Sequence, residues 1–413
     1  MTNASETGNS LKSLKIRNRK LVLAFLRKVG AVSVNSISQA TGLSKMTVHK
    51  IIDHYIQEGM VAIVGKGAST EEGGKKPNLF SFNPNCRFIF AIRLDGNRLS
   101  TSIVNLKGDT VVPRSWKFLE NMDYEETMAL IGQAFQEQLR TSGLAADSCL
   151  AVVAGCSGIV DSARGIGLTS YQFPEWRNNV PLLEGLKQQM PEHVFLHVDS
   201  WWRHMAHGEL YLSDIGERKT FFLIGNSSNY ISGGLVSNGR VCHGENGFAG
   251  EIGHMVVSPG CEVECVCGGH GCLESLVAPA RVAERAEKLR GEYPDSTVFP
   301  VNWTNGGDFI KKLADASAAG DELAKRLLDE AIGHIAVAIS NVIHVCDPGL
   351  ILVFGDYSKA GEQVMEALRE KVMHLNLRGI EKRTRIECSA LDENSGVIGA
   401  ANFVTDVLFA GGV

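Results

Sequence analysis

Near the start of the chain, hydrophobic residues recur at helical spacing, which predicts three short amphipathic helices. The helices are expected at Arg17–Lys28, Ser36–Thr41 and Lys45–Glu58. Gly42 can adopt the left-handed conformation that ends the second helix, and Ser44 can cap the third. The apolar residues that share one face of the first and third helices are Leu21, Val22, Phe25 and Leu26, then Val48, Ile51, Ile52 and Tyr55. This pattern predicts a small helical bundle with a polar outer face.

The third helix keeps a polar face because its apolar residues are used for packing. Its N-terminal half presents Lys45, Thr47, His49 and Lys50 to the outside. A short helix, a glycine turn and a second helix of this kind form a helix-turn-helix, whose second helix enters the DNA major groove. The lysines can contact phosphates or guanine, while Thr47 and His49 can reach base edges. The alternative is a three-helix packing module that makes no DNA contact.

Two apolar strands follow the third helix, at Met60–Val64 and Asn78–Phe82. The segment between them is rich in glycine and lysine, which is typical of a hairpin connection. Lys75 and Lys76 of this segment could contact the DNA backbone or the minor groove. The sequence therefore predicts a winged helix-turn-helix over residues 1–85.

After residue 85 the pattern changes to buried strands that alternate with helices. Strands are expected at Phe88–Arg93, Ser100–Val104, Leu150–Gly155, Phe195–Val198, Phe221–Gly225 and Leu350–Phe354, and helices include Tyr124–Arg140 and Leu323–His344. This alternation predicts an α/β domain. Its length fits two lobes, residues 86–200 and 201–413, with a ligand cleft between them. The C-terminal helix can return to the first lobe.

The bulk composition limits the class of protein. The chain has 413 residues, of which 44% are hydrophobic and 21% are charged, as in ordinary globular proteins. It contains no uninterrupted apolar stretch of about 20 residues, and its first residues lack the apolar centre of a secretory signal. We therefore expect a cytoplasmic protein without membrane insertion.

Charge is distributed unevenly along the chain. The first 85 residues carry 12 Lys and Arg against 5 Asp and Glu, so their net charge is +7, whereas the rest of the chain carries −12. A basic head on an acidic body indicates a polyanionic partner for the head alone. This favours the DNA-binding interpretation of the helix-turn-helix over a solvated tail.

Candidate metal chemistry concentrates in one glycine-rich stretch, where four of the ten cysteines lie close together. The spacing of Cys265, Cys267 and Cys272 lets a loop wrap a metal ion, and His254 could complete the shell. Cys261 and His270 are rival ligands. Three thiolates and an imidazole form a closed tetrahedral site without an open position for water, so a zinc ion here would be structural. The alternative is a group of ordinary reduced cysteines.

The sequence GEIGH at residues 250–254, followed by CVCGGHGCLE at residues 265–274, resembles the signature of the ROK family, the bacterial repressors, open reading frames and kinases. The likeness runs over essentially the whole chain, and LSKMTVHKIIDHYIQEGMV looks like the recognition segment of the family's repressors. The resemblance implies a winged helix-turn-helix followed by a two-lobed actin-like fold of the sugar kinase and RNase H-like type. It also implies a structural Zn²⁺ on four ligands, His254, Cys265, Cys267 and Cys272.

The same resemblance implies a set of sugar-binding residues. Glu251, His254 and Glu274 would contact sugar hydroxyls, and Asp199 matches the sugar-contacting aspartate that is the catalytic base in the kinases. Gln172 stands in the sugar loop where asparagine is usual. Carboxylates accept paired hydrogen bonds from hydroxyls, and a nearby zinc ion would stiffen the loop that holds them. From the residues alone, Asp199 could instead be a helix cap or surface charge, and Glu251 an exposed acid.

A kinase also needs a general base and a backbone cradle for the ATP phosphates. Family kinases carry Asp-x-Gly-Gly-Thr after the first strand, where this chain has Asp95–Arg98 without the Gly-Gly-Thr. Tyr230 places a ring in the second phosphate loop, where the backbone would have to approach phosphate closely, and Gly355-Asp356 replaces the usual Gly-Gly. We therefore expect no useful phosphotransfer, with Asp199 as the vestigial base position. Trp201 and Trp202 could stack on a sugar, but we favour the core for both.

These inferences predict a DNA-binding transcriptional regulator of carbohydrate-metabolism genes, with repression as the family's usual sense. A sugar or sugar phosphate in the cleft would shift the lobes and so control DNA binding. A homodimer or tetramer would bind palindromic double-stranded operator DNA. Two alternatives stay open: an active ROK sugar kinase that phosphorylates hexoses with ATP, and a repressor controlled by a protein partner.

Overall fold

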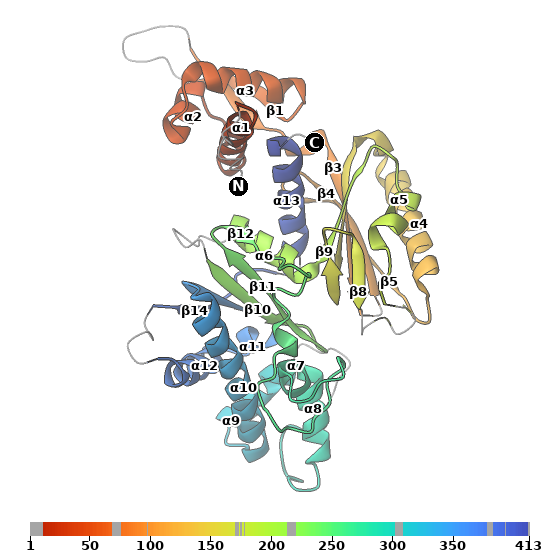
Figure 1. The fold of residues 1–413 in the computed structure, drawn as a ribbon, viewed down its shortest axis with the longest axis vertical. Coiled ribbons are helices and arrows are strands. Elements are labelled where there is room, and N and C mark those ends of the chain that lie inside the picture. The colour runs from red at the N-terminus through yellow and green to blue at the C-terminus, as the bar shows by residue number, and fades with distance from the viewer. Residues whose placement is uncertain are drawn as a thin grey trace, which may run out of the picture.

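The computed structural model describes residues 11–67, 76–96, 98–169, 173, 176, 178–212, 220–301, 309–377, 383–392 and 394–411. The chain forms three stacked parts (Figure 1): N-terminal helices at one end, an α/β lobe in the middle and a second α/β lobe at the other end. Lys75 and Gln172, which the sequence assigns to the wing and to a sugar loop, lie outside the described residues.

The N-terminal part is a winged helix-turn-helix. Its elements are α1 (Leu11–Lys28), α2 (Val34–Thr41), α3 (Lys45–Gln57) and an antiparallel hairpin of β1 (Val61–Lys66) and β2 (Asn78–Phe82). Ser44 caps α3 by accepting a hydrogen bond from Thr47 N at 3.2 Å, and Gly42 after α2 has φ of 69°, as the sequence predicts. α2 begins at Val34 rather than Ser36 because Ser33 is its cap, with Oγ accepting from Ser36 N. α1 begins at Leu11 rather than Arg17, since no glycine or proline interrupts the preceding residues.

The middle lobe, which we call lobe 1, is built on a five-stranded sheet of order β5-β4-β3-β6-β9. β3 pairs antiparallel with β4 and parallel with β6, which pairs parallel with β9. The strands are β3 (Phe88–Asp95), β4 (Arg98–Asn105), β5 (Thr110–Phe118), β6 (Cys149–Cys156) and β9 (Phe195–Ser200), with a separate hairpin of β7 (Ile159–Asp161) and β8 (Ile166–Thr169). Helices α4 (Tyr124–Ser142) and α5 (Leu182–Gln189) cover one face, and α6 (Trp201–Leu212) and α13 (Ser395–Gly411) lie on the other (Figure 1).

The end lobe, lobe 2, repeats this strand order in its own sheet, β12-β11-β10-β13-β14. β10 pairs antiparallel with β11 and parallel with β13, which pairs parallel with β14. The strands are β10 (Phe221–Asn226), β11 (Ile231–Ser237), β12 (Arg240–Val241), β13 (Leu350–Phe354) and β14 (Arg385–Cys388). The helices are α7 (Leu273–Val277), α8 (Pro279–Lys288), α9 (Phe309–Ala318), α10 (Glu322–Cys346), α11 (Asp356–Lys359) and α12 (Glu362–Leu375). Two sheets of the same order and pairing confirm the predicted α/β class and the two-lobed, actin-like fold.

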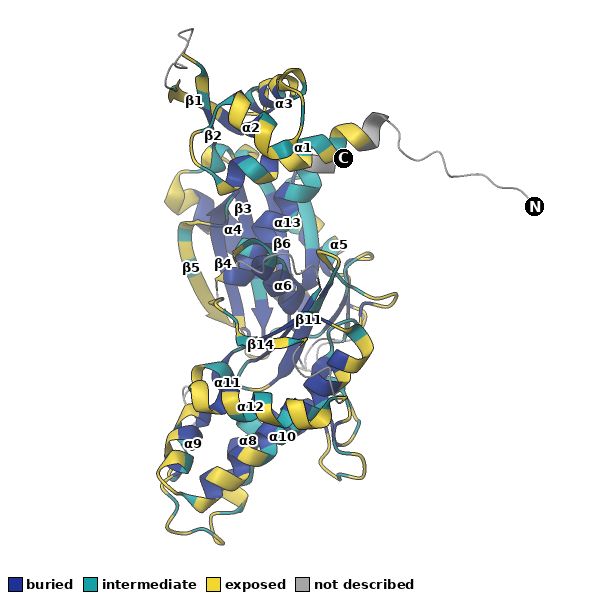
Figure 2. Cartoon of the chain, turned by 90° about the vertical axis from the view of Figure 1, so that its left-hand side faces the viewer, coloured by how far each residue is buried: buried dark blue, intermediate teal, exposed yellow. Residues whose placement is uncertain are grey.

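α10 is the one helix among the described residues that is long and apolar enough to cross a membrane. It has 25 residues, and its most apolar window has a mean hydropathy of 1.2. More than half of that window, 56%, is buried in the protein, where α10 packs against α9 and α12. Such burial is typical of a core helix, and Figure 2 shows α10 among the other helices of lobe 2.

α6 and α13 cross between the two sheets and form the most extensive helix pair of the molecule. Trp201 and Trp202 at the start of α6 are 3% and 5% exposed, so both belong to the core as expected. Glycines make room for them: a Cβ on Gly155 would come within 2.5 Å of the Trp201 ring, and one on Gly225 within 2.4 Å of Trp202. α1 of the head packs on α13, and one continuous apolar cluster extends from the head into both lobes. The head is therefore attached to the helix pair that lies between the lobes.

Candidate functional site

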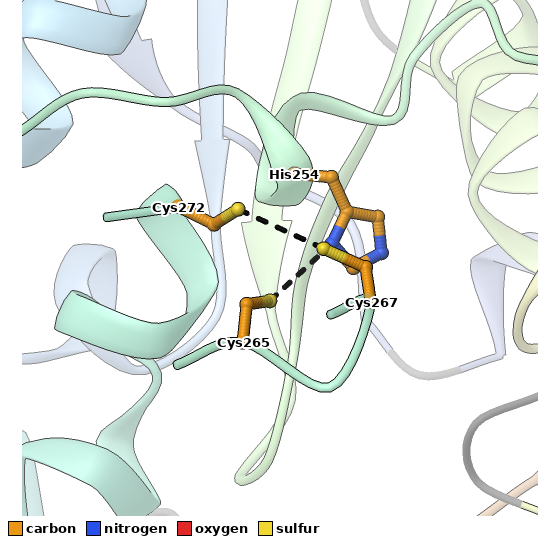
Figure 3. A group of neighbouring side chains, drawn as sticks. All are labelled: His254, Cys265, Cys267 and Cys272. Carbon is orange, nitrogen blue, oxygen red and sulfur yellow. Dashed lines mark hydrogen bonds between the residues drawn. The ribbon is translucent and has the colours of Figure 1, made fainter. Parts of the chain in front are cut away.

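Four side chains of lobe 2 form a compact cluster of possible metal ligands. His254 closes a short turn after Glu251, Cys265 and Cys267 lie on the following loop, and Cys272 is the residue directly before α7. Their ligand atoms all lie within 4.8 Å of one another. Cys265 Sγ is 3.6 Å from His254 Nδ1, and Cys267 Sγ is 3.8 Å from Cys272 Sγ (Figure 3). These distances suit three sulfurs and one nitrogen around a single ion.

The loop that carries this cluster is folded by backbone contacts and by glycine. The amide of Cys265 donates to Gly269 O at 2.8 Å, and Leu273 N donates to Met255 O at 2.9 Å. Gly271 has φ of 68°, and a Cβ there would lie 2.3 Å from Ser258 O. A side chain at this position would therefore push the loop apart. The compact group does not include Cys261 or His270, the two rival ligands.

A cleft of about 530 Å³ opens between the lobes beside this cluster. Glu251, His254 and Glu274 line it from lobe 2, and Ser157 lines it from lobe 1. Its volume lies in the range of roughly 300–1,000 Å³ that is typical of small-molecule sites. Glu274 Oε2 accepts a hydrogen bond from Ile231 N at 3.1 Å, which fixes the carboxylate at the end of β11. Burial raises the pKa of Glu251 to about 7 and that of Glu274 to about 7.

Asp199, by contrast, does not line this cleft, and its carboxylate is fully occupied. It is 1% exposed, and Oδ1 accepts from Arg203 Nε and from Ser200 N, each at 2.7 Å. Oδ2 lies 2.9 Å from His243 Nε2. Burial alone would raise the pKa of Asp199, but the bonds from His243 and Arg203 hold it well below its usual range. The carboxylate is therefore a buried, ion-paired anion, neither a helix cap nor a surface charge.

Arg203 and His243 were not anticipated from the sequence. Arg203 is 1% exposed and also donates to Gly247 O at 3.1 Å and to Val160 O at 2.9 Å, so its charge is satisfied on several sides. The position of Arg203 four residues after Asp199, at the start of a helix, was a signal that could have suggested the pair. The contact with His243 joins residues that are 44 positions apart, which no local pattern reveals.

On one side of the cleft, side-chain contacts connect residues at the ends of β3, β10 and β13. The Tyr230 hydroxyl donates to Asp95 Oδ1 at 2.7 Å, and Arg93 forms an ion pair with the other carboxylate oxygen. Across the cleft, Asn226 Nδ2 donates to Asp356 Oδ2 at 2.8 Å, while Asp356 N donates back to Asn226 Oδ1 at 2.9 Å. The cavity on this side measures about 210 Å³, below the usual range for ligand sites.

The predicted DNA-contacting residues of the head lie on its surface. Lys45, His49 and Lys50 are exposed on α3, and Thr47 is half-buried because its hydroxyl bonds to the cap Ser44 Oγ at 2.9 Å. Lys76 is exposed, two residues before β2 of the wing. Val48 between these residues is fully buried, so α3 turns its polar face outward as the sequence predicts.

Known proteins share both the sequence pattern and this architecture. The family model described as ROK family matches residues 89–407. The xylose repressor of Caldicellulosiruptor bescii is 24% identical over 397 residues, which are 96% of this chain and 97% of that protein. The glucokinase of Thermotoga maritima is 29% identical over 252 residues, 61% of this chain and 78% of that protein. The crystal structure of a ROK family transcriptional regulator, a homologue of the E. coli MLC protein, aligns with a TM-score of 0.80 at 20% identity, over 97% of this chain and 98% of that one. The chain therefore belongs to the ROK family.

Proposed function

We propose that this protein is a cytoplasmic transcriptional regulator that binds operator DNA and is controlled by a sugar or sugar phosphate in the cleft between its lobes. The observation that carries the proposal is the continuous core from the winged head, through α13, to the helix that leaves Asp199. The similarity to a xylose repressor over almost the whole chain supports it. Repression is the expected sense of regulation.

DNA binding is assigned to the exposed face of α3 and to the wing. Lys45 and Lys50 neutralise phosphates or bond to guanine, and Thr47 and His49 reach base edges. Lys76 and Lys75 are the wing contacts. A homodimer presents two such heads to the half-sites of a palindromic operator, and a tetramer would add a second pair.

The metal is proposed to be a structural Zn²⁺ on His254, Cys265, Cys267 and Cys272. The site fits zinc because it offers three sulfurs and one imidazole nitrogen, and because these four ligand atoms lie within 4.8 Å of one another. Bound zinc would neutralise the thiolates and fix the loop between Glu251 and Glu274, so these two carboxylates would meet the hydroxyls of a sugar in a rigid arrangement. The four protein ligands would complete the coordination shell of the ion, so no position would remain for a catalytic water or a substrate. Gln172 remains a proposed contact from the sugar loop.

Asp199 is proposed to act on the sugar site through Arg203 and His243 and not as a base. A base must be free to accept the proton of a sugar hydroxyl, whereas both oxygens of Asp199 already accept hydrogen bonds. The phosphate side is filled by Tyr230 and by the Asn226–Asp356 pair. We therefore expect no sugar kinase activity. Sugar-dependent ATP hydrolysis by the purified protein, abolished in Asp199→Asn, would contradict this expectation.

The deciding experiment measures operator binding with and without sugars. DNA selected from a random-sequence library by the purified protein supplies the operator, and pentoses, hexoses, N-acetylhexosamines and their phosphates are titrated against the complex. We expect one class to shift the operator Kd, and Glu274→Gln to weaken that response. Glu287→Gln is the matched control, because Glu287 lies on the surface of α8, where it pairs with Arg290. A sugar that stabilises the protein through Glu274 but leaves the operator Kd unchanged would remove the effector role.

A further inference from the structure

We propose that His197, Asp199 and His204 form a second metal site, in the core of lobe 1 and separate from the cysteine cluster. One ligand atom from each of the three residues lies within 4.8 Å of the others. His197 and Asp199 are two positions apart on β9, so their side chains point to the same face of the strand. His204 reaches that face from the first turn of α6. Two imidazoles and one carboxylate form a set that binds divalent transition ions.

His204 provides independent evidence that something occupies this place. The side chain is 1% exposed, and neither ring nitrogen has a hydrogen-bond partner among the described residues. A buried polar group without a partner costs about 1–3 kcal/mol, and native proteins satisfy such groups with protein atoms, water or ions. The ring centroids of His197 and His204 lie 5.5 Å apart, so an ion between the rings would give one nitrogen of His204 a partner.

The charges around the site decide which kind of ion fits. Arg203 and the backbone of Ser200 bond to Asp199 Oδ1. Oδ2 bonds to His243 Nε2 at 2.9 Å and also lies 3.8 Å from His197 Nε2. The side chain of His197 is only 12% exposed, so its imidazole lies inside the protein beside this oxygen. The positive charge of Arg203 disfavours the binding of any cation at this site. The site therefore suits an ion with high affinity for imidazole nitrogen, such as Zn²⁺ or Co²⁺, and not Mg²⁺ or Ca²⁺, which bind oxygen.

His243 supplies the entry path and a fourth donor. Its Nε2 lies 2.9 Å from Asp199 Oδ2, and its side chain is 37% exposed, whereas Asp199 is buried beneath it. An incoming ion would replace this hydrogen bond, with the imidazole turning onto the metal. His243 follows β12 of lobe 2, so a bound ion would connect the two lobes. His197 also packs on Phe403 of α13 at 4.2 Å, next to the helix that supports the head.

The test is a metal titration of the full-length protein after chelator treatment. Co²⁺ is the probe, because thiolate ligands give it sulfur-to-metal charge-transfer absorption and histidine–carboxylate ligands do not. We expect two equivalents, one with this absorption and one without. His204→Asn should lose the equivalent without thiolate absorption and keep the other, and Cys267→Ser should do the reverse. His193→Ala, which removes an exposed histidine before β9, should keep both.

His243→Ala provides a second variant, since a partly exposed side chain can be removed without disturbing the core. The affinity for the second equivalent, the one without thiolate absorption, should fall by about 10-fold or more, because the variant loses a ligand or a group that orients a ligand. Binding of a single equivalent by the wild-type protein would show that water alone satisfies His204 and would overturn the proposal. A second equivalent that persists in both His204→Asn and His243→Ala would overturn it as well. Neither outcome depends on whether a sugar binds the cleft.

Discussion

Arg27 of α1 is a polar contact between the DNA-binding head and the lobes, and Arg27→Met tests whether this joint transmits the effector signal. The residue is 9% exposed, and one guanidinium nitrogen donates to Leu106 O of lobe 1 at 3.2 Å. Another lies 3.5 Å from Asp406 Oδ1 on α13. The guanidinium also stacks 5.0 Å from the ring of Tyr211, which itself bonds to Asp406. Methionine keeps the apolar stem and the helix propensity but removes these contacts.

The expected cost follows from the contacts. A hydrogen bond from a charged donor contributes about 1.5–3 kcal/mol. The ion pair adds about 0–1 kcal/mol, because the side chain of Asp406 is 44% exposed and solvent screens it. The carbonyl of Leu106 keeps the hydroxyl of Thr405 as a partner, so no acceptor is left unpaired. We expect docking of the head to weaken by about 2–3 kcal/mol, which is roughly 30- to 150-fold in the docking equilibrium.

Hydrogen exchange measures the docking of the head directly, since amides at the α1–α13 contact should exchange faster in Arg27→Met. Operator binding should persist in this variant, whereas its dependence on sugar should shrink, because the lobes no longer constrain the head. Arg140→Met is the matched control, as Arg140 on α4 pairs with Glu137 and its side chain is 71% exposed. If exchange at α1 and the sugar response both match those of the control, Arg27 is not the joint.

Three further predictions address the head, the metal cluster and the core. Lys50→Ala should weaken binding to all DNA sequences and reduce the salt dependence of the Kd by about one phosphate contact, whereas His49→Ala should change base preference. Binding isotherms at several salt concentrations measure both effects. Cys267→Ser should lose the metal equivalent with thiolate absorption and unfold at a lower temperature. Cys388→Ser changes an exposed cysteine and should match the wild type in metal analysis and calorimetry. Gly155→Ala should destabilise the protein by about 1–3 kcal/mol in urea unfolding because its Cβ would overlap Trp201, and Gly291→Ala, which meets nothing within 4 Å, should not.

Local patterns in the sequence were sufficient to predict the helix-turn-helix and the grouping of the three cysteines. Ser44 and Gly42 set the ends of the helices through contacts within a few residues, and such contacts are encoded locally. Cys265, Cys267 and Cys272 are likewise close in sequence, so their spacing restricted them to one loop. The buried strands could be recognised because a short apolar run between turns is typical of a buried strand.

The environment of Asp199 could not be obtained in the same way. The sequence placed it at the end of a strand, which β9 confirms. Whether a carboxylate at that point faces the cleft or the core depends on how α6 leaves the strand, and no residue pattern specifies that turn. Its partner His243 comes from the other lobe, and the neighbouring His204 has no partner that a pattern could suggest. Contacts of this kind are products of the assembled fold.

Packing at the start of α6 provides a physical connection between the cleft and the head. Trp201 packs against Gly155 of lobe 1 and Gly396 at the start of α13, and Trp202 packs against Gly225 of lobe 2. The start of α6 is therefore wedged between both sheets and α13. Because packed cores switch between discrete arrangements and do not deform smoothly, we expect a ligand that moves lobe 2 to move α6 and α13 as well.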